Sequence, residues 1–166
     1  MNAEAFRYLY EYHFSENHKI WESVRQLSWE QFTRNVDYSR GPVRDQVVHL
    51  IGCDETWFSE LQGIEPLEDL SPAGVDDREA IRTHWDNVER RMRGYLLELQ
   101  DEMLLTRPIQ EPEEDRQLLL WQVLIHVVNH GTDHRAQVLR VLNDLGIETT
   151  YQDYIFYAYG HSMNSG

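Results

Sequence analysis

The chain has 166 residues and a formal net charge of −14, because 29 acidic side chains outnumber 15 basic ones. This length predicts one domain, 1–166, and the negative charge argues against nucleic acid or an anionic membrane surface as a partner, since both bind basic patches. A single cysteine excludes a disulfide framework, no apolar run approaches a membrane span, and acidic residues stand where a signal peptide is basic, so we expect a cytoplasmic protein.

The first predicted helix runs from about residue 6 to residue 27, where apolar side chains recur at alternating steps of four and three. The middle of this stripe is polar, because His13 and Asn17 stand where two apolar residues are expected. Buried polar groups must find hydrogen-bond partners or line a wet pocket, and a helix that is partly exposed at its centre would give the same pattern. Both residues are therefore pocket candidates.

The second predicted helix lies between Pro42, which suits a first helical position, and Gly63, which suits a C-terminal stop. His49 lies at one margin of its apolar stripe, and Cys53 follows one turn later. A histidine in such a place is more often a partly buried hydrogen-bonding residue than a ligand. Cys53 is interpreted as a small buried apolar residue, with a fourth metal ligand as the alternative.

The third predicted helix follows a capping-box match at residues 76–79 and carries an apolar stripe from Ile81 to Leu99. His84 lies off this stripe beside charged residues, so we expect it to be solvated. The connection 101–116 contains Pro108 and Pro112 and ends in an acidic run that suits the N-terminus of a following helix.

The last long helix, residues 121–145, carries three of the eight histidines, each four residues from the next: His126, His130 and His134. A four-residue step keeps side chains on one side of a helix, so two such imidazoles can reach one metal ion. His130 and His134 stand inside a mostly apolar stripe that also includes Gln137. A metal site and a pair of hydrogen-bonded core histidines both explain this pattern.

The same helix has a second apolar face, which predicts a homodimer through Trp121, Leu124 and Val128 because four helices leave that face uncovered. Gly131 in mid-helix indicates close approach by a neighbouring element or a local bend. The aromatic tail, residues 151–159, is expected to pack as a lid or to seal one end of the bundle.

Three stretches together resemble the DinB/YfiT-like family of metal-dependent helical proteins: VRDQVVHLIGCDETWF, LLWQVLIHVVNHGTDHRAQVLRVLNDLG and YQDYIFY. The resemblance covers nearly the whole chain. It implies an all-α four-helix bundle of up-down-down-up topology, usually dimeric, followed by a short aromatic C-terminal segment. It also implies a three-histidine metal site at His49, His130 and His134, with His126 outside the ligand set. Family members often read HxxHHR where this chain has Asp133, which is not an implied ligand.

Three neutral imidazoles suit a divalent Zn, Ni or Fe ion and leave a coordination position for water or substrate. Some relatives use low-molecular-weight thiols in transfer or isomerisation reactions. The first hypothesis is therefore a metal-dependent enzyme, a thiol-dependent transferase or a hydrolase, that acts on a small and neutral electrophile. The second is a non-catalytic metal-binding or stress-response module. Beside the metal, the pocket candidates are His13, Asn17, His126 and Gln137.

Overall fold

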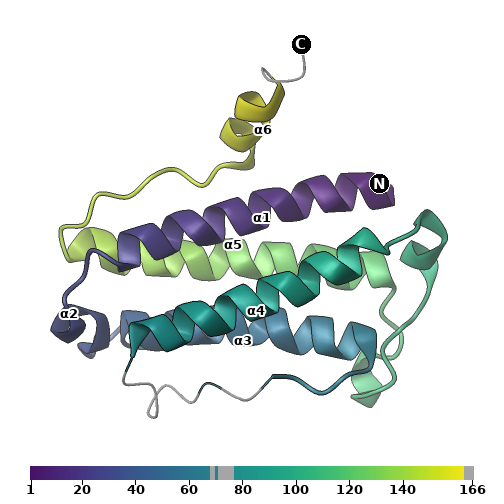
Figure 1. Ribbon diagram of the computed structural model, residues 1–166, viewed down its shortest axis with the longest axis horizontal. Helices are drawn as coiled ribbons and strands as arrows, with labels where there is room; N and C mark the ends of the chain where they lie inside the picture. The colour runs from purple at the N-terminus through teal and green to yellow at the C-terminus, as the bar shows by residue number, and fades with distance from the viewer. Residues whose placement is uncertain (68–69, 71–76, 163–166) are drawn as a thin grey trace.

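The computed structural model describes residues 1–67, 70 and 77–162, and these residues form helices and loops without a strand (Figure 1). Four helices of 20 to 25 residues make up most of the protein. They are α1 (Ala3–Val24), α3 (Val43–Gln62), α4 (Arg78–Leu97) and α5 (Leu120–Asp144). Shorter elements are α2 (Trp29–Thr33), α6 (Tyr154–Ser162) and the 3-10 helices η2 (Asp101–Leu105) and η3 (Glu113–Asp115). The predicted all-α class is confirmed.

Local sequence signals define the helix ends. Pro42 directly precedes α3, and Gly63 ends it in the left-handed conformation, with φ of 62°. Asp77 caps α4, because its carboxylate accepts a hydrogen bond from the backbone N–H of Glu79. The capping box predicted at 76–79 starts at Asp76, which lies outside the described residues.

The four long helices enclose one core. Helices α1 and α3 each contact both α4 and α5, so the four form a closed ring in cross-section. Large apolar side chains from all four helices are almost fully buried inside it: Phe6, Tyr10, Phe14, Leu50, Phe58, Ile81, Trp85, Met92, Leu124 and Leu142. Helix α5 packs between α1 and α3, and its position brings residues of three helices together.

The second apolar face of α5 is covered within the chain, contrary to the reasoning that predicted the dimer. Leu124 is 0% exposed and Val128 is 6% exposed, and the Tyr10 hydroxyl of α1 donates a hydrogen bond to the Leu124 carbonyl over 3.0 Å. Only Trp121 keeps a large exposed fraction, 40%. Helices α1 and α3 and the 3-10 helix η2 all contact α5, so it does not need a second chain to bury these two residues. The homodimer itself stays a prediction.

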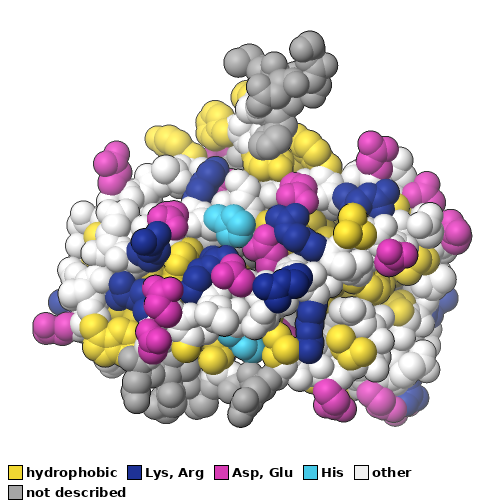
Figure 2. All heavy atoms as spheres, viewed as in Figure 1, with side chains coloured by type: hydrophobic (Ala, Val, Ile, Leu, Met, Phe, Trp, Pro, Cys, Tyr) yellow, Lys and Arg dark blue, Asp and Glu magenta, His cyan; other side chains and the backbone are white. Residues whose placement is uncertain are grey.

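The aromatic tail forms α6, which projects from the bundle beside α1 (Figure 1). Tyr157 is buried, and its ring lies 5.6 Å from those of Tyr8 and Tyr12 between centroids. Ile155 and Phe156 are about half exposed, and hydrophobic side chains gather around α6 in Figure 2. Tyr157 thus packs the tail against the bundle, while Ile155 and Phe156 leave an exposed apolar surface. Among the described residues, no helix is long and apolar enough to cross a membrane.

Candidate metal centre

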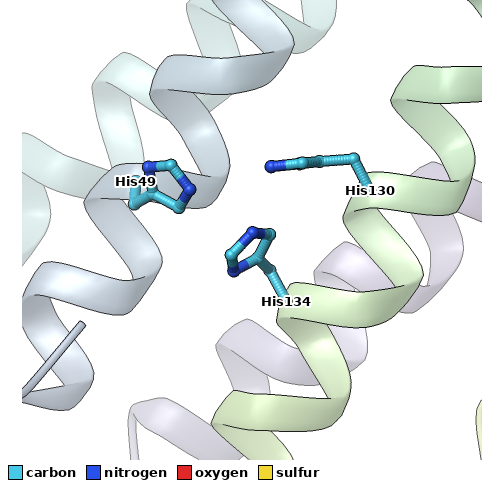
Figure 3. Close-up of side chains that lie close together, drawn as sticks. All are labelled: His49, His130 and His134. Atoms are coloured by element: carbon cyan, nitrogen blue, oxygen red, sulfur yellow. The ribbon is translucent and has the colours of Figure 1, made fainter. Parts of the chain in front are cut away.

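Three histidines from two helices meet at the junction of α3 and α5 (Figure 3). His49 projects from α3 toward His130 and His134, which lie one turn apart on α5. Each offers one ring nitrogen such that the three nitrogens lie within 4.8 Å of one another. The ring centroids are 4.2 Å apart for His130 and His134 and 4.5 Å apart for His49 and His134.

This spacing fits a metal ion. A ring nitrogen binds zinc at about 2.0–2.1 Å, so the nitrogens around a tetrahedral ion lie about 3.4 Å apart. The three nitrogens lie within 4.8 Å of one another, so each pair needs to approach by at most about 1.4 Å to share one ion. The local order of α5 creates the His130–His134 pair, and the packing of α3 on α5 supplies the third nitrogen.

All three imidazoles are held in the neutral form that binds metals. Burial, followed by the positive charge of Arg40, lowers the pKa of His49 to about 4. Burial is also the main cause that lowers the pKa of His130, with His134 adding to it. The pKa of His134 is lowered by burial and by Arg40, while Asp133 opposes the change. Near neutral pH a metal ion has few protons to displace from this site.

Cys53 lies one turn beyond His49 but is not part of the three-nitrogen group. Its sulfur is 3.7–3.8 Å from the ring nitrogens of His49. Burial, with the nearby carboxylate of Asp54, raises the pKa of the thiol to about 11, so the sulfur keeps its proton at neutral pH. The residue is partly exposed rather than buried as predicted.

A cavity of about 610 Å³ opens beside His49 and Cys53. Its wall also includes Arg40 at one side, Trp57 on α3, and the acidic residues Glu60 and Asp115. Glu60 carries a raised pKa because of burial and the neighbouring Asp115. A small molecule in this cavity would contact the His49 ring directly.

His13 and Asn17, the pocket candidates of the first helix, belong to a polar network in the core. Their exposed fractions are 0% and 1%, so they have no surface with which to wall an open pocket, and the helix is not frayed at its centre. The Arg135 guanidinium donates to Nδ1 of His13 over 3.2 Å and to Oδ1 of Asn17 over 2.9 Å. The sequence left open whether these two residues find hydrogen-bond partners, line a wet pocket or lie in an exposed part of the helix. In the structure they have hydrogen-bond partners in the core.

The network balances two buried charges. Because an arginine can only donate, Nδ1 of His13 accepts, and the ring proton belongs on Nε2. This nitrogen lies 3.0 Å from Oδ2 of Asp54, which accepts the proton in a hydrogen bond. His13 therefore connects the Arg135 cation to the Asp54 anion. The other oxygen of Asp54, Oδ1, is buried with no hydrogen-bond partner among the described residues.

Gly131 makes room for this network. A Cβ atom at this position would lie 2.5 Å from Cε1 of His13 and 3.0 Å from a guanidinium nitrogen of Arg135. The close approach expected at this glycine is thus made by His13 of α1.

Two other predicted residues, His126 and Gln137, lie beside the three histidines. His126 is exposed, and its ring centroid is 5.0 Å from Trp57 and 5.7 Å from His130. Gln137 donates to the Asp133 carboxylate over 3.0 Å and contacts Ser39. His84, expected to be solvated, is instead only 12% exposed in its side chain and bonds the Glu55 carboxylate over 2.8 Å. That prediction was wrong because α4 packs its His84 side against α3.

The sequence analysis did not identify two residues of this region, Arg135 of the buried network and Arg40 of the cavity wall. Arg135 directly follows His134 and lies one turn after Gly131, so the glycine together with the polar stripe of the first helix was the signal for a buried polar group there. Arg40 lies in a loop with no periodic pattern, and nothing in the sequence connects it to the histidines.

Comparison with known proteins agrees with this picture. The DinB family model matches residues 1–164. Protein DinB of Bacillus subtilis (strain 168) is 25% identical over 166 residues, which cover 96% of each chain. A crystal structure of a conserved protein from Enterococcus faecalis superposes with a TM-score of 0.68 at 12% identity, over 82% of this chain and 94% of that one. The last similarity concerns the fold alone.

Proposed function

The chain belongs to the DinB family, and on this premise we propose that it binds one divalent metal ion, Zn, Ni or Fe, through His49, His130 and His134. The observation that carries this proposal is the convergence of three ring nitrogens within 4.8 Å from two different helices. Hydrogen-bonded core histidines, the alternative for the His130–His134 pair, would not require a third imidazole from α3 to point at the same spot.

We further propose that the site activates a small-molecule thiol for transfer to a small electrophile. A divalent ion held by three neutral ligands keeps its full charge and lowers the pKa of a thiol bound at its open position. The chain supplies three neutral imidazoles, and the neighbouring cavity beside His49 has room for a small ligand. Cys53 does not compete for this role because its own thiol stays protonated.

The second candidate is a metal-binding module without catalysis. It is supported by the carboxylates near the three histidines. Among the described residues, Asp133 and Asp54 are the carboxylates that raise the pKa of His130, and each already has another hydrogen-bond partner, so neither is free to act as a general base. A thiol activated by the metal would need no general base. The two candidate functions are therefore distinguished by whether a thiol binds to the metal-loaded protein and reacts.

We also propose the up-down-down-up order of the four long helices. Residues 63–77 connect α3 to α4, and a stretch of this length can run back along a 20-residue helix of about 30 Å. The two helices would then start at the same end of the bundle.

The metal proposal is tested by elemental analysis of protein purified without an affinity tag. Wild-type protein is expected to hold about one divalent ion per chain, and His130→Ala to hold almost none. His126→Ala is the matched control, because this exposed histidine lies one turn away on the same helix, outside the three-nitrogen group. Equal metal content in the two variants would contradict the assignment.

The thiol proposal is tested with metal-loaded protein, a panel of physiological thiols and model electrophiles. Wild-type protein should consume thiol and electrophile together, and His134→Ala should not. If thiols bind to the loaded protein but no electrophile reacts, the non-catalytic module is the better account.

A further inference from the structure

Arg40 is carried on a tight turn beside the metal centre. The N–H of Gly41 donates to the carbonyl of Tyr38 over 3.0 Å and closes the turn. Both neighbours of Arg40 are left-handed, with φ of 53° at Ser39 and 84° at Gly41. A left-handed serine costs about 1–2 kcal/mol, so this conformation persists only where surrounding contacts hold it.

The turn is attached to both helices that carry the histidines. The Ser39 hydroxyl bonds the side-chain oxygen of Gln137 on α5, close to His134. From α3, the buried side chain of Gln46 donates to the carbonyl of Gly41 over 2.7 Å. These contacts hold the backbone of Arg40 at the α3–α5 junction, where the three imidazoles meet.

Arg40 lies beside the candidate metal centre and has no partner in the described part of the chain. It lines the same cavity as His49 and Cys53, so its side chain lies near both. No hydrogen bond or ion pair joins Arg40 to another described residue, whereas Arg44 pairs with Asp45 next to it. A cation without a partner among the described residues is unexpected in a chain with 29 acidic and 15 basic residues.

We propose that Arg40 binds a carboxylate of the thiol ligand whose sulfur occupies the open position of the metal, an inference that rests on the proposed function. The cavity that exposes the His49 ring is also lined by Arg40, so one small ligand can touch both. A carboxylate and a guanidinium match in charge and in planar hydrogen-bonding geometry.

The other charged residues in the described wall of the cavity orient such a ligand. Glu60 and Asp115 lie in the same wall and repel a carboxylate, and Asp45 is paired with Arg44. The anionic end of the ligand is therefore directed to Arg40. Its thiol loses a proton to solvent, and the resulting thiolate is directed to the metal. The overall acidity of the chain still favours a neutral electrophile as the second substrate.

The test compares two thiols of similar length on cobalt-loaded protein: 3-mercaptopropionate, which has a carboxylate, and 2-mercaptoethanol, which has none. Binding is followed by the cobalt–thiolate absorption rather than by turnover. Wild-type protein is expected to bind 3-mercaptopropionate about tenfold more tightly, the value of one charge-assisted contact. Arg40→Ala should remove this preference, and Arg40→Lys should keep part of it.

Arg140→Ala is the control, because this exposed arginine of α5 is paired with Asp144 and does not line the cavity. It should keep the wild-type preference. Equal affinity of wild-type protein for the two thiols, or a preference that survives in Arg40→Ala, would overturn the role of Arg40 and leave the metal site intact. If wild-type protein holds no cobalt, or the loaded protein binds neither thiol, the proposed function itself fails, and the role of Arg40 fails with it.

Discussion

Replacing Gly131 with alanine tests whether the buried network, rather than helix propensity, determines the residue at this position. In an exposed helix interior, alanine is more stable than glycine by about 1 kcal/mol. Here the added Cβ would meet Cε1 of His13 at 2.5 Å and Nδ1 at 2.9 Å, closer than such atoms approach in real proteins. Neither neighbour can simply swing away, because His13 and Arg135 are both 0% exposed and bonded to each other.

The opposing contributions give the expected size. Overpacking a core costs about 1–3 kcal/mol, and each buried polar group that loses its partner costs about 1–3 kcal/mol more. After subtracting the roughly 1 kcal/mol gained in helix propensity, Gly131→Ala should lower the free energy of unfolding by about 3 kcal/mol. For a chain of this length, that corresponds to a fall in Tm of roughly 6–12 °C.

The assay is urea and thermal unfolding at neutral pH with a chelator present, so that bound metal does not contribute. Gly94→Ala is the control, because this exposed glycine of α4 has nothing within 4 Å of the added Cβ and should gain up to about 1 kcal/mol. In a His13→Ala background, Gly131→Ala should cost much less, since the clashing ring is gone. A Gly131→Ala protein as stable as the wild type would refute the reasoning.

Three predictions concern titration. Metal binding at pH 6.0, followed by calorimetry in buffers of different ionisation enthalpy, should release fewer protons per ion than the roughly two that three imidazoles of ordinary pKa would release, because the pKa of each histidine is lowered. Because folding lowers the pKa of His49 to about 4, this residue binds more protons in the unfolded apo chain than in the folded one between about pH 4 and 6.5, and through it the free energy of unfolding should fall as the pH is lowered through this window. Iodoacetamide at pH 8 should alkylate Cys53 about 100-fold more slowly in folded protein than in urea, since its pKa is raised to about 11; equal rates would contradict that pKa.

The sequence by itself determined the helices and the features that depend on one helix alone. Period-3.6 patterns located the four long helices, and the four-residue step placed His130 and His134 on one side of α5. Such properties are local, because the geometry of one helix decides which of its residues share a face. Gly131 signalled a close neighbour for the same reason, without saying which residue it was.

Only the tertiary structure decided which faces meet. Spacing along the chain left His49 as a partly buried hydrogen-bonding residue, and only the family resemblance implied it as a third ligand. The packing of α3 on α5 brings its ring to the other two. Packing of α1 on α5 helped to cover Leu124, and packing of α4 on α3 placed His84 against Glu55, both contrary to expectation. Arg40 reached the metal centre through a turn with no periodicity. The register between helices depends on how side chains from distant parts of the chain interlock, and no pattern within one segment contains that information.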